Sequence, residues 1–175
     1  ISQPAAALQL VAKEIFRMSD QVRDILKKTI ELVKNEEVKS IDGLKENGEQ
    51  VERLGKCITE YLAALFSSGS LTEQQAAQTA SLMYILSDVE RMGTLSVEMA
   101  ECMLERSDRK YKYTPEAMDE LQKSLKVLNK MFCDSLKALQ GDDGIEPGKM
   151  MKRKDKLLDL DIKMRKAHIE RVNKG

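Results

Sequence analysis

The side chains that most often carry catalysis or bind transition metals are scarce in this sequence. His168 is the single histidine among 175 residues, so histidine-based zinc or iron sites are not expected. Cys57, Cys102 and Cys133 are far apart and form no Cys-x-x-Cys pair, which predicts reduced cysteines in a cytosolic setting. One histidine cannot serve as the base for three scattered cysteines, and no phosphate-binding glycine loop or His-Glu-x-x-His motif occurs. These residues argue against an enzyme.

The charges balance overall but not along the chain. Lys and Arg number 29, as do Asp and Glu, yet residues 149–175 hold ten basic and four acidic residues. A solvated helix face is the simplest interpretation of this basic segment. An anionic membrane surface is an alternative partner. Nucleic acid is not expected, because the rest of the chain is acidic and aromatic residues make up only 4%.

The stretch from Leu71 to Arg106 organises the rest of the chain. Its apolar and small residues recur every three or four positions, which predicts one helix of about 36 residues and roughly 54 Å. Thr72 and Gln75 have the spacing of a capping box at its start. A helix of this length needs partners of similar length. The predicted stripe is Leu82, Ile85, Leu86, Val89, Met92, Gly93, Ser96, Ala100 and Met103.

Four further helices are predicted, over about 3–35, 41–66, 115–139 and 149–173. Ser2 with Pro4, and Thr114 with Pro115, are typical of helix starts. The glycines of 41–66 predict a frayed or irregular first half for that helix. The breaker at 140–148 separates the last two helices. The methionines of the long helix are expected in the core. The expected inward residues include Leu8, Val11, Ile15, Met18, Val22, Ile25, Leu26, Thr29, Val33, Leu44, Val51, Leu54, Ile58, Tyr61, Leu62, Leu65, Met118, Leu121, Leu125, Leu128, Phe132, Leu136 and Leu139. The apolar positions of the last helix are Leu157, Leu158, Leu160, Ile162, Met164, Ile169 and Val172.

The order of these elements predicts an all-α protein with an internal repeat. Residues 1–107 form a complete three-helix unit, and 108–175 form a second unit that lacks its third helix. No apolar stretch approaches the ~20 residues needed to span a membrane, and no signal peptide is visible. Because the chain stops at Gly175, where a sixth helix is expected, the last two helices should expose an apolar face and self-associate.

Four segments resemble PhoU-like domains. LTEQQAAQTASLMYILSDVERMG at 71–93 resembles the third helix of such domains, which opens with Leu-Ser/Thr-Glu-Glu and continues to Asp-x-Glu-Arg-x-Gly-Asp. ITEYLAAL at 58–65, KAHIERVNKG at 166–175 and QPAAALQLVAKEIFRM at 3–18 resemble one subgroup. That subgroup is the cytoplasmic C-terminal region of bacterial sodium/phosphate cotransporters. The resemblance covers nearly the whole chain.

The resemblance implies PhoU-like antiparallel helix bundles and a regulatory or accessory role in sodium-dependent phosphate transport. Such a domain acts by protein contacts and is not an enzyme. The implied location is the cytoplasmic face of the inner membrane, as a soluble domain of a membrane protein. The implied partners are the transmembrane part of its own transporter, further copies of the chain and an anionic membrane surface. Two alternatives stay open: a carboxylate bundle that binds metal, and a free-standing helical adaptor.

The resemblance also implies a place for a divalent or ferric metal. In PhoU proteins a carboxylate and an Asp one turn later, on two facing helices, offer four oxygens to a hard cation. Here Glu52 and Glu90 match two of these positions, with Asp88 nearby, but Gly48 and Thr94 stand at the other two. In the second unit Asp155 and Asp159 keep the spacing. The simpler interpretation of Asp88 and Glu90 is solvated charge, and no cofactor is required.

Overall fold

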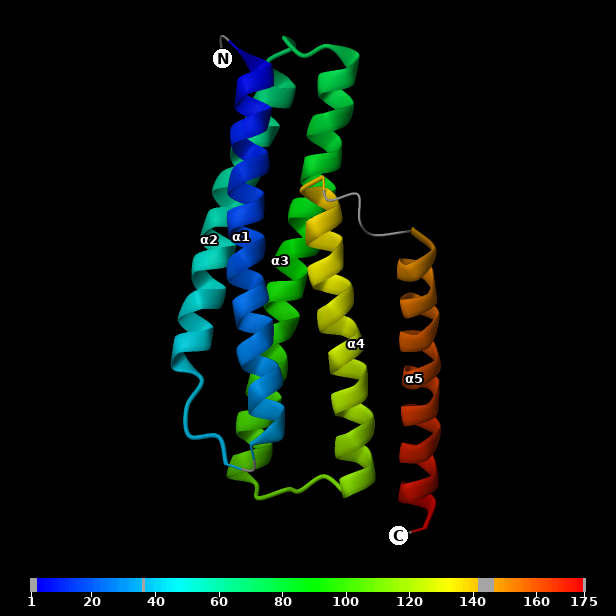
Figure 1. The fold of residues 1–175 in the computed structure, drawn as a ribbon. Helices are drawn as coiled ribbons and strands as arrows, with labels where there is room; N and C mark the ends of the chain where they lie inside the picture. The colour runs from blue at the N-terminus through cyan, green and yellow to red at the C-terminus, as the bar shows by residue number, and fades with distance from the viewer. Residues whose placement is uncertain (1–2, 36, 142–146, 175) are drawn as a thin grey trace. The chain divides into compact units, whose positions relative to one another are not determined.

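The computed structural model describes residues 3–35, 37–141 and 147–174, and the described elements are all helical. They are α1 (Pro4–Lys34), α2 (Asp42–Ser67), α3 (Glu73–Asp108), α4 (Pro115–Leu139) and α5 (Pro147–Asn173), shown in Figure 1. The all-α prediction and the five predicted helices are confirmed. The N-cap predicted at Ser2 and part of the breaker at 140–148 lie outside the described residues. Within the described part, no helix is long and apolar enough to cross a membrane.

The chain packs as two compact units. The first comprises Ile1–Thr29 with Ser40–Cys102, and the second comprises Ile30–Lys39 with Met103–Gly175. Both α1 and α3 therefore contribute to both units. The predicted repeat boundary at 107/108 concerns internal similarity, which packing does not measure, and it stays a prediction.

The first unit is an antiparallel bundle of α1, α2 and α3, as Figure 1 shows. All nine residues predicted to face inward from α1 are buried. Thr29 of α1 donates from Oγ1 to the carbonyl oxygen of Ser96 at 3.0 Å, so a polar side chain in this core has its partner on α3. Gly93 lets α3 approach α1 closely, because a Cβ there would lie 3.3 Å from Cγ2 of Val22. Close approach of helix backbones explains why small residues occupy the middle of the α3 stripe.

Some sequence predictions for α2 and α3 are wrong in detail. The sequence predicts that Tyr61 faces inward, but its side chain is 41% exposed because it lies at the edge of the α2 stripe. Helix α2 is continuous from Asp42 to Ser67, so its glycines cause no irregular first half. Among the methionines of α3, Met103 is buried whereas Met83, Met92 and Met99 are half-buried. The capping box is confirmed, with reciprocal bonds of 3.0 and 3.2 Å between Thr72 and Gln75.

Arg106 ties the end of α1 to α3 within the second unit. Its guanidinium donates to the carbonyl oxygens of Val33, at 3.5 Å, and Asn35, and it stacks 5.1 Å from the ring centroid of Tyr113. The carbonyls at the C-terminus of a helix lack intrahelical partners, and Arg106 supplies donors for them. Ser107 next to it accepts from the backbone N–H of Val38 at 2.9 Å, which fixes the connection after α1.

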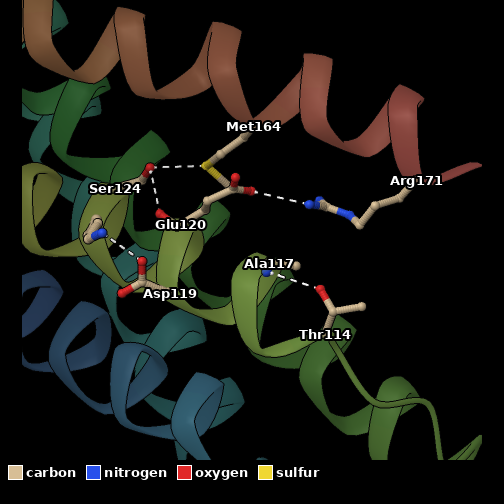
Figure 2. Close-up of polar contacts among 8 residues, drawn as sticks. Thr114, Ala117, Asp119, Glu120, Ser124, Met164 and Arg171 are labelled. Carbon is tan, nitrogen blue, oxygen red and sulfur yellow. Dashed lines mark hydrogen bonds and ion pairs between the residues drawn. The ribbon is translucent and has the colours of Figure 1, made fainter.

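Helices α4 and α5 pack side by side in the second unit. Thr114 caps α4 by accepting from the backbone N–H of Ala117 at 3.2 Å, as predicted (Figure 2). Ser124 lies 3.1 Å from Sδ of Met164, and Glu120 pairs with Arg171 at 3.6 Å (Figure 2). The predicted inward position of Leu139 is wrong, because this residue at the last turn of α4 is 44% exposed.

Candidate carboxylate cleft between α2 and α3

A cleft of about 210 Å³ lies between α2 and α3 in the first unit. Its walls carry carboxylates from both helices, a single lysine and several small or branched residues. Glu52 from α2 and Glu90 from α3, the pair predicted from the sequence, both line it. The lining residues are Lys45, Gly48, Glu49, Val51, Glu52, Glu90, Thr94, Val97, Glu98 and Glu101.

Glu90 lies directly over the backbone of Gly55. A Cβ on Gly55 would fall 1.8 Å from Oε1 of Glu90, 2.6 Å from Cδ and 3.0 Å from Cγ. Only a residue without a side chain leaves room for the Glu90 carboxylate at this point of α2. Gly55 is therefore a positioning residue that lets Glu90 lie along α2 and reach the cleft.

The environment of Glu90 disfavours its charged form. Burial raises the pKa of the Glu90 carboxyl above its ordinary value of 4.5, and the nearby Glu52 carboxylate raises that pKa further. The two glutamates thus interact across the cleft, although Glu52 itself is exposed. A cation or a proton placed between them would relieve the repulsion.

Gly48 and Thr94 occupy the two positions at which PhoU-like domains carry further acidic residues. A Cβ on Gly48 would lie 2.9 Å from Cγ2 of Val97, so Val97 fills the space that a longer side chain on α2 needs. Thr94 uses its hydroxyl to donate to the carbonyl oxygen of Glu90 one turn earlier, at 3.2 Å. The cleft therefore has tight packing and a backbone hydrogen bond where the family pattern has carboxylates.

An ion pair joins α2 and α3 at the cleft. Lys45 Nζ and Glu101 Oε1 are 2.9 Å apart, and the hydrogen bond from Lys45 to Glu101, reinforced by the Glu101 charge, raises the pKa of Lys45. Glu49 forms an ion pair with Arg53 on its own helix, with Oε2 of Glu49 3.6 Å from Nη1 of Arg53. Sequence reasoning missed Lys45, Glu98 and Glu101. The available signal was spacing along each helix. Lys45 is seven residues from Glu52 on α2, and Glu98 and Glu101 are four and seven residues from Thr94 on α3, which places them on the same helix faces.

The other predicted site residues do not line the cleft. Asp88 is exposed on α3 and does not line it. On α5, Asp155 and Asp159 are exposed, and Asp159 pairs with Lys163 at 2.6 Å. His168 is exposed on its helix, as predicted. Cys57, Cys102 and Cys133 are free thiols on three different helices.

The donor set does not fit the family's four-carboxylate pattern. Glu52 and Glu90 supply two carboxylates, and neither Gly48 nor Thr94 adds a third. Across residues 3–35, 37–141 and 147–174, no group of three or more His, Cys, Asp or Glu side chains is arranged to hold a metal ion. A hard cation bound by the pair alone would take most of its six or more oxygen ligands from water. Metal binding by Glu52 and Glu90 stays a prediction.

The PhoU domain family matches residues 15–103, slightly more than half of the chain and the part that carries the cleft. The chain belongs to the PhoU domain family. It is 23% identical over 165 residues to the phosphate-specific transport system accessory protein PhoU homolog 1 of Thermotoga maritima, covering 94% of this chain and 68% of that protein. No solved structure gave a significant match. The PhoU resemblance is confirmed, whereas its assignment to the cotransporter subgroup stays a prediction.

Proposed function

We propose that this protein is an accessory regulator of phosphate uptake that acts by protein contacts. Its functional site is the α2–α3 cleft. Membership of the PhoU domain family carries this proposal. The relative from Thermotoga maritima, named as an accessory protein of phosphate-specific transport, supports it. The family match spans all of the residues that line the cleft, so the function is assigned to that part of the chain.

The transporter in this proposal is a sodium-dependent phosphate cotransporter, to which the chain is attached on the cytoplasmic side. The support is the resemblance of residues 3–18, 58–65 and 166–175 to that subgroup. The basic α5 adds a second argument, because Lys152, Lys154 and Lys156 are exposed and would favour an anionic inner leaflet. Transmembrane helices encoded upstream of Ile1 would agree with this arrangement, and their absence from the gene would favour a free-standing adaptor.

The test is the initial rate of radiolabelled phosphate uptake by cells of the source organism. Cells that lack the gene are compared with cells in which it has been restored, at low and high external phosphate, with sodium and with potassium as the main cation. The proposal predicts that deletion changes the uptake rate several-fold and that the change requires sodium. A change without sodium dependence would refute the cotransporter, and equal rates in all cells would refute the proposed function.

A second candidate function is a metal-linked switch at the same cleft. The observation that favours it is that Glu52 and Glu90 line the same cleft from two helices. Burial, and after it the Glu52 charge, raises the pKa of Glu90, and a bound cation would favour the charged form of both carboxylates. Elemental analysis after exposure to iron, manganese, zinc and magnesium tests this function. One equivalent of metal that is lost in Glu90→Ala but kept in Asp88→Ala supports it. Metal at background level in the wild-type protein contradicts it.

A further inference from the structure

Arg106 is a buried cation in the second unit, and the residue is only 8% exposed. Its guanidinium donates to the carbonyl oxygens of Val33 and Asn35, which carry only partial negative charge. Across residues 3–35, 37–141 and 147–174, no carboxylate forms an ion pair with Arg106, and its buried Nε has no hydrogen-bond partner. A buried charge is costly unless it is both hydrogen-bonded and paired, so this position favours an anion.

A small cavity lies beside Arg106. Its volume is about 90 Å³, which corresponds to roughly three water molecules at ~30 Å³ each. That is room for a small ion, whereas pockets for drug-sized ligands measure ~300 Å³ or more. The residues that line it come from the end of α1, the end of α3, the α3–α4 link and the first turns of α4: Lys34, Asn35, Arg106, Tyr111, Lys112, Tyr113 and Met118.

The side chains around this cavity are cations and hydrogen-bond donors. Lys34 from α1, Arg106 from α3 and Lys112 from the link each bring a positive charge, and no carboxylate of the described residues lines the cavity. Tyr111 and Tyr113 add phenol hydroxyls, which can donate to an anion. Cations that come from separate segments suit an ion whose oxygens point in several directions. The lining therefore fits a small oxyanion and does not fit a metal cation.

A wider cavity of about 630 Å³ shares Tyr111 and Lys112 with the small one. Its lining has mixed charge, since Glu37 and Asp108 lie there together with lysines. The organic part of a larger molecule could occupy this second space. Two sources of an oxyanion therefore fit the pair of cavities: a free ion, or the terminal phosphate of an organic phosphate.

We propose that the small cavity binds a tetrahedral oxyanion of the phosphate class, and we call it the oxyanion pocket. Arg106 donates to the anion, while its bonds to the Val33 and Asn35 carbonyls hold the guanidinium in place. Lys34 and Lys112 supply the further positive charge. The oxyanion pocket shares no lining residue with the α2–α3 cleft, so it stands or falls independently of the role proposed for that cleft.

The test is equilibrium dialysis of the whole chain at pH 7.5 and 0.15 M sodium chloride, with radiolabelled inorganic phosphate in one series and radiolabelled glycerol 3-phosphate in another. At least one of the two should bind at one molecule per chain, raise the melting temperature and bind more weakly as salt is added. Lys34→Gln with Lys112→Gln should raise the dissociation constant about tenfold or more, because charge-assisted bonds to the anion are lost. These substitutions leave the bonds of Arg106 to the carbonyls intact, so the variant should fold.

Lys28→Gln with Lys110→Gln is the matched control. It removes two exposed lysines from the same helix and the same link, and neither lines the oxyanion pocket. The control should leave the dissociation constant within a few-fold of wild type, and circular dichroism should show equal helix content for both double variants.

The two labelled compounds distinguish the sources of the oxyanion. Tighter binding of inorganic phosphate supports a free ion, and tighter binding of glycerol 3-phosphate supports the terminal phosphate of an organic molecule. The proposal is overturned if neither compound binds at millimolar concentration. It is also overturned if the Lys34 and Lys112 variant binds as tightly as the control. Neither result bears on uptake in cells, which tests the cleft.

Discussion

Replacing Gly55 with alanine tests the geometry of the cleft. Two effects of the added methyl group oppose one another. Alanine in the interior of α2 should raise the free energy of unfolding by ~1 kcal/mol, because glycine is the poorer helix former. The same methyl group overlaps Oε1 and Cδ of Glu90 and lies 3.0 Å from its Cγ, so the stem of Glu90 must move as well as its carboxylate.

The size of the second effect follows from that overlap. Forcing Glu90 out of its rotamer costs roughly 0.5–1.5 kcal/mol, which cancels most or all of the gain from alanine. Gly55→Ala should therefore leave stability unchanged to within about 0.5 kcal/mol, or lower it. With Glu90→Ala already in place the obstacle is gone, and Gly55→Ala should stabilise by the full ~1 kcal/mol.

Urea unfolding at pH 7 is measured for the wild-type protein, both single variants and the double variant. These four proteins form a double-mutant cycle for Gly55 and Glu90. The predicted coupling free energy between the two positions is about 1 kcal/mol. Gly43→Ala is the control, since a Cβ on Gly43 meets nothing within 4 Å, and it should not couple to Glu90. Additive effects of Gly55→Ala and Glu90→Ala would refute the close contact between these residues.

Three further predictions concern Glu90 and two helix ends. The folded-state pKa of Glu90 is raised above 4.5, so its contribution favours the folded state below this pH and is lost as pH rises through the raised value. Glu90→Gln should remove this decline from the pH profile of urea stability, and an unchanged profile would count against it. Arg106→Ala should cost about 2–4 kcal/mol by leaving the Val33 and Asn35 carbonyls without a donor, measured by urea unfolding; a loss below 1 kcal/mol would contradict this. Thr114→Ala should cost ~1 kcal/mol by uncapping α4, and a thermal melt equal to wild type would contradict that.

Local sequence signals predicted most of the fold. The Thr72–Gln75 capping box predicted the N-terminus of α3, and Thr114 with Pro115 predicted that of α4. Both predictions work because capping depends on residues within one turn. The apolar period of α1 predicted its buried face because one stripe satisfies a helix packed on one side. Tyr61 and Leu139 lie at a stripe edge and at a helix end, where period alone does not decide burial.

The contacts within the cleft were harder to predict from the sequence. The Glu52–Glu90 pair was predicted through a family resemblance, but the contact between Glu90 and Gly55 depends on how closely α2 approaches α3. No local pattern encodes that distance. The same holds for Gly48 and Val97, whose packing explains a missing carboxylate. Arg106 looked like an ordinary basic residue in the last turn of a helix, yet it binds the end of another helix about 70 residues away.

We propose that the α2–α3 cleft of this PhoU domain regulates phosphate uptake. The most direct test is the initial uptake rate in cells whose protein carries Glu52→Gln with Glu90→Gln. Cells carrying Glu60→Gln with Asp88→Asn, two exposed positions on the same helices outside the cleft, are the matched control. We expect the cleft variant, present at the wild-type protein level, to change the uptake rate as deletion does, and the control to give the wild-type rate. Equal uptake in wild-type and cleft-variant cells, in a strain where deletion has an effect, would contradict it.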